Sequence, residues 1–353
     1  MNVNTYYLSA NTGGGHVSFF DDLLNSFRKI IVLKDFPPDY KKIIFDEVTK
    51  ALDDGGFFYD KIISCATSDS IAALIIDSLS TAVADEEIIT TEIPLYADVI
   101  DFTDIINCDY EEKKNLSFSN EKINKLKRKM VSHLTEAKKI HDEWEKIYIS
   151  NLDFDKINNE ADKLISSLLD GEVSKDGLGS DCSRFFGTLL PRGNINYIDK
   201  LTDNFIKRIF IKGRPGTGKS TILKKFASAA REKGYNTETY YCSLDTKSVD
   251  MIVVRELGIA AFDSTSPHEK FPQRPGDEIF DVYEIGKKTN IDDYYSDELM
   301  MVSNQYNDEI KKAKECLYTI LALKNGMSKL LRADNSVLDS LSSKIINMSS
   351  ICK

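Results

Sequence analysis

Short apolar runs alternate along the chain with longer segments whose apolar positions recur at helical spacing. The run at 206–212 reads Ile-Lys-Arg-Ile-Phe-Ile-Lys, which is short enough for a buried strand. The segment 220–232 follows with few helix breakers, and the apolar positions on its one helical face are Ile222, Leu223, Phe226 and Ala230. The runs 237–242 and 257–262 are again typical of strands. This pattern predicts an α/β core.

Each half of the chain ends in segments with helical periodicity. The segment 120–149 is highly charged and lacks both glycine and proline, and 154–169 continues the helical pattern. Later in the chain, 297–331 and 337–346 repeat the order of a long helix and then a short one. The pattern predicts one helical hairpin after each core. It leaves open whether the hairpins cover the cores, form a bundle or bind a protein partner.

An internal repeat relates the two halves. A shift of 178 residues aligns 11–85 with 189–263 without a gap, and about sixteen of roughly seventy-five pairs are identical. We therefore expect two tandem P-loop NTPase-like three-layer α/β cores. The expected boundaries are a first domain at 1–170, a linker rich in Gly, Ser and Asp at 171–184, and a second domain at 185–353.

The second copy contains a complete phosphate-binding loop, G-x-x-x-x-G-K-[ST], between the predicted strand and the predicted helix. Its glycines allow backbone N–H groups to surround anionic oxygens, and the following helix adds its positive N-terminal end. The spacing predicts ATP bound by Gly213, Arg214, Pro215, Gly216, Thr217, Gly218, Lys219, Ser220 and Thr221. Lys219 would reach the β- and γ-phosphates, and the Ser220 hydroxyl would help to hold Mg²⁺.

The first copy has lost this loop chemistry. At the aligned positions Asp35 replaces Gly213, Pro38 replaces Gly216 and Tyr40 replaces Gly218, and of the key loop residues only the lysine is kept, as Lys41. Proline has no N–H to donate, tyrosine disfavours positive φ, and aspartate repels phosphate. We expect the first half to keep the fold without binding a triphosphate.

Acidic and basic residues near the loop are candidates for the remaining chemistry. Asp263 ends a predicted strand, where P-loop enzymes place the acid that orients Mg²⁺, and Asp245 is the competing acid. His268 follows in a loop and is a candidate to position water or substrate. Candidates to neutralise transition-state charge are Arg214, Arg255 and Arg274. The predicted catalytic residues are Lys219, Asp263 and His268, and the predicted metal ligands are Ser220 and Asp263.

Composition restricts the partners. The chain has 46 basic and 56 acidic residues, a net charge of −10, which does not favour nonspecific nucleic-acid binding. Its six cysteines are scattered without a Cys-x-x-Cys pair, which argues against a zinc site or a disulfide scaffold. No apolar segment is long enough for a membrane span, and the N-terminus does not resemble a signal peptide. A cytoplasmic protein is the expectation.

Several of these motifs together resemble a known group of proteins. The residues that carry the resemblance are Phe185 with Leu190-Pro191-Arg192-Gly193, the loop 213–221, and the string Asp263-Ser-Thr-Ser-Pro-His268. With the tandem cores, they resemble an uncharacterised bacterial family of duplicated P-loop ATPases. The resemblance covers nearly the whole chain and implies ATP as the ligand. The loop is also similar to that of AAA+ ATPases, but Ser264 follows Asp263, so the Asp-Glu pair of that class is missing.

Three functions fit these residues. The leading hypothesis is a slow Mg²⁺-dependent ATPase in which bound nucleotide sets the packing of the two halves, as in a switch or assembly factor. The second is a kinase that transfers the γ-phosphoryl group to a small acceptor, with Asp245 or Asp263 as base. The third is a nucleotide sensor without catalysis.

Overall fold

The computed structural model describes residues 3–67, 70–106, 108–191, 193–331 and 333–351, and it contains two mixed six-stranded sheets. The strands of the first sheet are β1 (Val3–Tyr6), β5 (Tyr59–Ile63), β6 (Ile71–Ile76), β7 (Thr81–Asp85), β4 (Lys29–Lys34) and β8 (Asp98–Asp101), in spatial order. Those of the second are β9 (Asp181–Phe185), β13 (Thr237–Tyr241), β14 (Val249–Val254), β15 (Ile259–Asp263), β12 (Lys207–Lys212) and β16 (Asp277–Asp281). Each half adds a two-stranded hairpin, β2 (Ser9–Thr12) with β3 (Gly15–Ser18) and β10 (Gly187–Leu190) with β11 (Gly193–Asn196).

The two sheets have the same topology. In both, the third strand in spatial order is antiparallel to its two neighbours and the other pairs are parallel. Both also shift register at equivalent places, between Ile62 and Ile63 and between Tyr240 and Tyr241. These pairs are 178 residues apart, as the repeat requires. The tandem α/β organisation is therefore confirmed.

Ten helices accompany the described strands, and the long and short helices follow the predicted order. Their bounds are α1 (Pro38–Asp54), α2 (Phe102–Ile105), α3 (Tyr110–Ile149), α4 (Phe154–Leu168), α5 (Ile198–Leu201), α6 (Lys219–Glu232), α7 (Val282–Gly286), α8 (Ile291–Tyr294), α9 (Ser296–Leu330) and α10 (Asn335–Met348). Helix α3 begins ten residues before the predicted start, at a capping box in which Asp109 and Glu112 bond each other's backbone N–H. The predicted linker ends inside β9, which pairs with β13.

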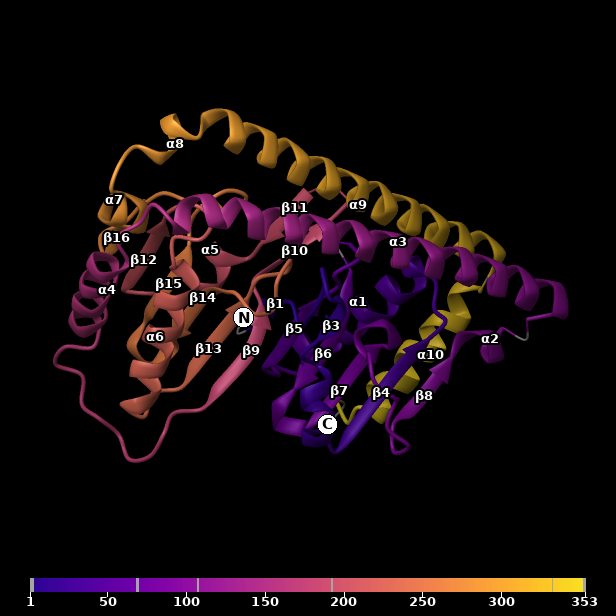
Figure 1. Ribbon diagram of the computed structural model, residues 1–353. Helices are drawn as coiled ribbons and strands as arrows, with labels where there is room; N and C mark the ends of the chain where they lie inside the picture. The colour runs from indigo at the N-terminus through magenta and orange to yellow at the C-terminus, as the bar shows by residue number, and fades with distance from the viewer. Residues whose placement is uncertain (1–2, 68–69, 107, 192, 332, 352–353) are drawn as a thin grey trace.

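The short terminal helices are exchanged between the cores. Helix α4 ends the first half but packs its apolar face, including Ile157 and Ile165, into the hydrophobic core of the second sheet. Helix α10 ends the chain but packs against α1 of the first core through residues such as Leu338 and Ile345. The long helices α3 and α9 lie side by side across both cores and make these crossings possible (Figure 1). Each half therefore completes the core of the other.

The two sheets meet at their edge strands around a pseudo-two-fold axis. Tyr7 and Phe185, which are 178 residues apart, exchange two backbone hydrogen bonds of 3.2 and 2.9 Å. On this side, a single cluster of buried side chains joins both sheets with the 3-10 turn Asp21–Ser26 and helix α5. Two helices thus cover one face of each sheet. On the opposite face, this shared cluster takes the place of the third layer that the expected three-layer core would have.

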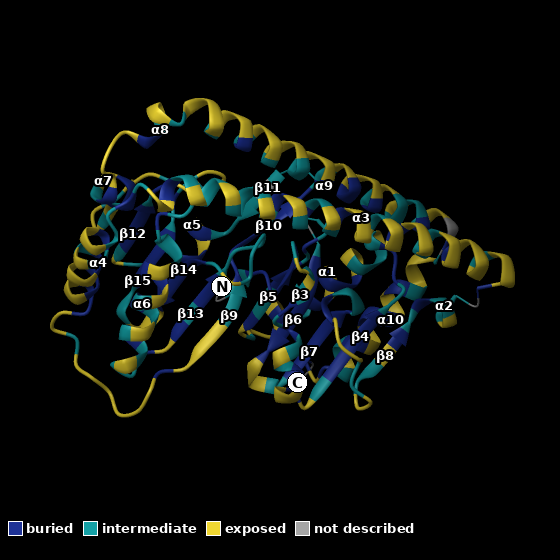
Figure 2. Cartoon of the chain, in the orientation of Figure 1, coloured by how far each residue is buried: buried dark blue, intermediate teal, exposed yellow. Residues whose placement is uncertain are grey.

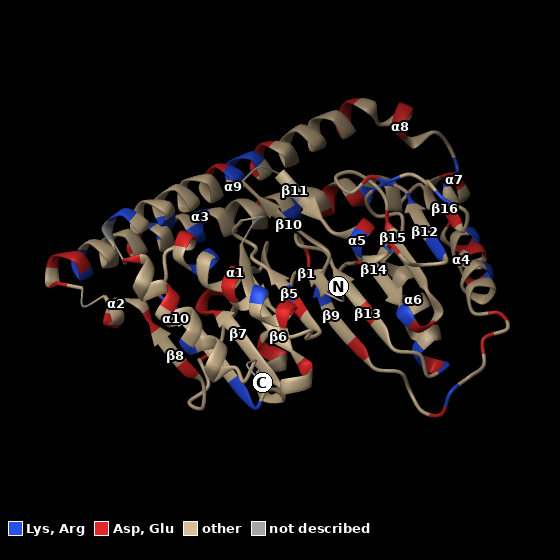
Figure 3. Ribbon diagram, turned by 180° about the vertical axis from the view of Figure 1, so that it is seen from behind, with Lys and Arg blue, Asp and Glu red and all other residues tan. Residues whose placement is uncertain are grey.

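The solvent exposure of the residues follows this arrangement of sheets and helices. The central strands are buried along most of their length, whereas the outward faces of α3 and α9 are exposed (Figure 2). Acidic and basic residues are interspersed along both helices (Figure 3). Among the described residues, no helix combines the length and apolarity that a membrane span requires.

Candidate functional site

The loop 213–220 connects β12 to α6, as the sequence predicts. Gly216 and Gly218 have φ values of +74° and +92°, in the left-handed region that glycine adopts without strain. The Thr217 hydroxyl donates a hydrogen bond of 2.8 Å to the Arg214 carbonyl and closes the turn. Gly218 is the residue that precedes the first turn of α6, so the loop leads directly into the positive end of that helix. Backbone geometry and helix dipole together favour an anion here.

Lys219 and Asp263 face each other beside this loop. The Lys219 Nζ lies 2.9 Å from the Arg214 carbonyl oxygen and 3.5 Å from the Asp263 carboxylate. Asp263 ends β15, which pairs in parallel with β12, so its position follows from the sheet topology. The other Asp263 oxygen accepts hydrogen bonds from the Thr265 N–H and hydroxyl, at 2.9 and 2.6 Å. The structure therefore brings the predicted lysine and acid together.

A second carboxylate that the sequence analysis missed stands next to Asp263. Asp250 lies in β14 beside Met251, which pairs with Phe262 of β15, so the antiparallel register places Asp250 opposite Asp263. Burial, and then the nearby charge of Asp263, raises the pKa of Asp250 to about 8. Asp250 thus carries a proton at neutral pH, and a bound cation would favour its ionised form.

Two other predicted groups have partners in the structure. The Ser220 hydroxyl accepts a hydrogen bond of 2.8 Å from the Val249 N–H, so β14 orients it beside the carboxylate pair. Asp245, the competing acid, forms an ion pair of 3.1 Å with Lys138 of α3. Thr221 is exposed on the first turn of α6. Ser220, Asp250 and Asp263 supply hard oxygen ligands of the kind that Mg²⁺ prefers.

Helix α3 of the first half closes over the loop of the second. A Cβ atom added to Gly216 would lie only 2.7 Å from the Glu145 backbone oxygen, so the helix and the loop are in direct contact. Burial, and then the charge of Asp142, raises the pKa of Glu145, while the charges of Lys138 and Lys219, and then the Gly216 backbone, oppose that rise. Glu145 therefore places a carboxyl group beside the loop and near Lys219.

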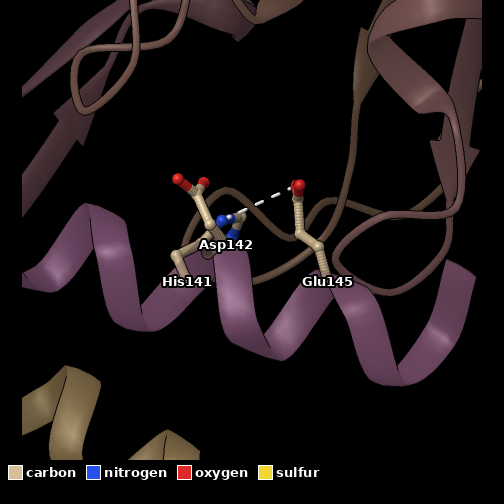
Figure 4. A group of neighbouring side chains, drawn as sticks. All are labelled: His141, Asp142 and Glu145. Carbon is tan, nitrogen blue, oxygen red and sulfur yellow. Dashed lines mark ion pairs between the residues drawn. The ribbon is translucent and has the colours of Figure 1, made fainter.

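Glu145 belongs to a small polar group on α3 (Figure 4). The His141 Nδ1 lies 3.6 Å from the Glu145 carboxylate, and ligand atoms of His141, Asp142 and Glu145 all lie within 4.8 Å of one another. Asp142 already forms an ion pair of 2.9 Å with Lys138. Burial, and then the charge of Lys219, lowers the pKa of His141, which keeps its ring neutral at physiological pH.

Aromatic side chains from α3 and α9 cover the same region. The rings of Trp144 and Tyr306 are 6.1 Å apart at 64°, and His141 lies 5.9 Å from Tyr306. Burial, followed by the charges of Cys242 and Asp250, raises the pKa of Tyr306, so that hydroxyl stays protonated beside the acids. From α4, the Phe154 ring lies 3.6 Å from where a Cβ of Gly218 would stand. The loop is thus covered by α3 and α4 of the first half, with α9 of the second half packed beside α3.

The remaining basic candidates are mostly structural. Arg214 forms an ion pair of 2.9 Å with Asp292 and lies over the Tyr283 ring. Arg255 bonds Glu238, and Arg274 bonds the Thr202 and Asp203 carbonyls.

Chain direction excludes two of these arginines from the loop. Arg255 lies in the short turn that leads from β14 into β15, and Arg274 lies three residues before the start of β16. Both therefore stand at the sheet edge opposite the loop, because β15 and β16 are parallel to β12. They are not available to a phosphate at Lys219.

His268 approaches the acids from the loop after β15. Its ring packs 4.7 Å from the Phe186 ring, and its buried Nδ1 has no hydrogen-bond partner among the residues that the structure describes. Burial lowers the pKa of His268, and the Asp263 charge opposes that shift. His268 therefore lies close to Asp263, though against the hydrophobic cluster. Arg192 of the lead-in string lies outside the described residues.

The equivalent place in the first core is filled by protein groups. Lys41 forms a buried ion pair of 2.5 Å with Asp85, and Asp35, with φ +58°, donates its N–H to Glu86 at 2.7 Å. Tyr40 packs against Phe102. The lysine is thus paired with Asp85 and the Asp35 amide with Glu86, while the absence of triphosphate binding in this copy stays a prediction.

Some of these residues carry a signal in the sequence and others do not. Asp250 is an acid inside an apolar strand and replaces Ala72 of the first copy, so the repeat alignment could have singled it out. His141 and Glu145 lie on a charged helix about 75 residues before the loop, and only the crossing of α3 brings them to it.

Searches among protein families, curated proteins and solved structures find no match to this chain.

Proposed function

We propose that this protein binds ATP with Mg²⁺ at the loop 213–220 and acts as a slow ATPase switch whose nucleotide state sets the position of α3. One observation carries the proposal. Glu145 of the first half packs its backbone oxygen and Cβ directly against Gly216 in the second half's loop, and its carboxyl group lies within the field of Lys219. A phosphate in that loop would compete with the Glu145 carboxylate for Lys219, so that binding is coupled to the contact between the halves.

The residues around the loop have distinct tasks in this proposal. The backbone amides and Lys219 bind the phosphate oxygens, and Ser220, Asp250 and Asp263 hold the cation. When bound, Mg²⁺ would neutralise charge that develops on the phosphates. Asp250 has to release its proton to act as a ligand, because its pKa is raised to about 8.

A slow reaction fits the acids that are present. Ser264 follows Asp263 where AAA+ proteins have a glutamate, so no acid adjacent in sequence activates water. His141 and Glu145 are the nearest groups on α3 that could accept a proton, and His141 is kept neutral by its lowered pKa. We infer that water activation depends on α3 and hence on how the two halves pack.

The chain offers its own reporter for a binding test. Trp144 is the single tryptophan and precedes Glu145, so its emission follows events at the loop. Titration of Mg-ATP, with calorimetry in parallel, is expected to change Trp144 emission saturably. Replacement of Lys219 by alanine removes a charge-assisted contact worth ~1.5–3 kcal/mol, which predicts ~10–100-fold weaker binding. Lys41→Ala is the matched control in the first copy and should retain the affinity of the unmodified protein.

The outcomes separate the three functions. Phosphate release that Lys219→Ala abolishes supports the ATPase, whereas turnover only in the presence of a metabolite mixture indicates a kinase. Tight binding without turnover indicates a sensor. Equal losses of affinity in Lys219→Ala and Lys41→Ala, or no heat on titration of Mg-ATP, would contradict the assignment of the site.

A further inference from the structure

The first core contains a cavity at the place that corresponds to the nucleotide site of the second. The cavity has a volume of about 130 Å³ and lies under α3 and α9. Asp85 and Ala72 line it, and these residues are the repeat equivalents of Asp263 and Asp250. The degenerate copy has therefore lost the phosphate loop but kept a small space beyond it.

Different chemistry now surrounds this space. Cys65, at the end of β5, is buried in the cavity wall, and its Sγ lies 3.9 Å from the His16 Nδ1. The Asn11 Nδ2 donates toward the same sulfur at 3.8 Å. In the second copy these three positions hold Ser243, Asn194 and Leu189, so the thiol group is particular to the first.

His16 is oriented by contacts at both ring nitrogens. Its Nε2 lies 3.1 Å from the Glu87 carbonyl oxygen, and its Nδ1 lies 3.3 Å from the Asn11 Oδ1 as well as facing the sulfur. A carbonyl and an amide oxygen both accept, so both ring nitrogens act as donors when the imidazole is protonated. This geometry suits an imidazolium beside a thiolate. His16 is itself exposed and stands at the mouth of the cavity.

The charges around the pair support the same state. Burial alone would raise the pKa of Cys65, but the hydrogen bond and charge of His16, with a hydrogen bond to Ser9, lower the pKa of the thiol below its ordinary value. The other charged groups that line the cavity are Asp85, Glu87, Lys127 of α3 and Lys324 of α9. Both lysines form ion pairs with Glu87, which weakens the repulsion between Glu87 and a thiolate.

We propose that Cys65 is a nucleophilic thiolate, paired with His16, that reacts with small hydroperoxides entering this cavity. The volume corresponds to about four water molecules, which admits an electrophile of a few heavy atoms and excludes a nucleotide. The thiolate sulfur attacks one peroxide oxygen and the O–O bond breaks. The leaving hydroxide, or the alkoxide of an organic hydroperoxide, takes the Nδ1 proton of the His16 imidazolium to form water or an alcohol, and Cys65 becomes a sulfenic acid.

The chain provides an internal control for the test. Cys182 is an exposed cysteine, and partial desolvation of its sulfur raises the pKa of the thiol. It therefore shows how fast a thiol that is not activated reacts. The full-length protein is treated with limiting hydrogen peroxide at about pH 6, where an ordinary thiol of pKa about 8.5 is almost fully protonated. Sulfenic acid is trapped with dimedone and located by peptide mass spectrometry.

We expect Cys65 to be modified before Cys182. Each unit of lowered pKa raises the thiolate fraction about tenfold in this range and reduces its nucleophilicity by about threefold, which leaves about a threefold net gain. His16→Gln should slow the reaction and move its pH midpoint upward. Asn11→Leu, which installs the second copy's residue, should have a smaller effect, and Cys65→Ser should abolish trapping at that peptide.

Two results would overturn the proposal. One is modification of Cys65 no faster than Cys182 in the unmodified protein, which requires no variant to fold. The other is an unchanged rate and pH midpoint in His16→Gln. The ultraviolet absorbance of the thiolate, in a variant that keeps Cys65 as its only cysteine, shows why the reaction fails. If Cys65 is ionised but unreactive, peroxide does not reach the cavity. If Cys65 is protonated, His16 does not stabilise the thiolate.

Discussion

Replacement of Glu145 by glutamine tests directly whether α3 competes with phosphate at the loop. The substitution keeps the length of the side chain but removes the negative charge near Lys219. A charge-assisted contact of this kind contributes ~1.5–3 kcal/mol. Because the Glu145 side chain is 36% exposed, we discount this to ~1 kcal/mol, or about a fivefold change in affinity.

The assay is titration of ATP without Mg²⁺, followed by Trp144 emission. Glu145→Gln is expected to bind about fivefold more tightly than the unmodified protein, because the nucleotide no longer displaces a carboxylate. Glu143→Gln is the matched control on the same helix, since Glu143 is exposed and, within the described part of the chain, forms its one ion pair with Lys146 at 2.5 Å. That control should bind like the unmodified protein.

The pH dependence gives a second readout of the same competition. The pKa of Glu145 is raised, so its carboxylate is neutralised at a higher pH than an ordinary glutamate. The difference in affinity between Glu145→Gln and the unmodified protein should therefore narrow as the pH falls through that raised pKa. Weaker or unchanged binding in Glu145→Gln, or an equal gain in Glu143→Gln, would refute the idea that this carboxylate competes with phosphate for Lys219.

Two further predictions concern buried acids. Native Asp250 keeps its proton up to about pH 8, whereas an unfolded aspartate loses it near pH 4, so the stability of the nucleotide-free protein falls as pH rises between these values. Asp250→Asn should therefore raise the free energy of unfolding at about pH 8 by ~1–3 kcal/mol, measured by thermal unfolding. The same variant should bind ATP more weakly in the presence of Mg²⁺. A variant that is less stable than the unmodified protein at that pH would contradict the argument. Hydrogen bonds from Arg208 lower the pKa of buried Asp277 to about 2, so this pair contributes stability above about pH 4 that is lost as pH falls toward 2. Denaturant unfolding should show that the free energy of unfolding falls by ~2–3 kcal/mol over that range. Arg208→Ala should remove this pH dependence and lower the free energy of unfolding by ~3–5 kcal/mol at neutral pH. An acid-stable protein with an unaffected Arg208→Ala variant would show that the pair is dispensable.

The sequence alone determined the local elements of this protein. Apolar spacing and breakers located the strand at Lys207–Lys212, the helix that follows the loop, and the two long helices within a few residues except at the start of α3. Spacing along the chain also related the two halves, because equivalent strands lie 178 residues apart, or 180 for β8 and β16, and form sheets of the same topology. Lys219 and Asp263 were predictable together, since the ends of neighbouring parallel strands meet at one sheet edge.

Only the tertiary structure decided which core each helix completes and which groups surround the loop. An apolar stripe such as that of α4 specifies that a face is buried, not the surface that buries it, and the chain satisfies it on the opposite core. Glu145 reaches Gly216, and Cys65 faces His16, through contacts between segments about 70 and 50 residues apart. Such contacts arise from how whole elements pack, and no local pattern of residues encodes that packing.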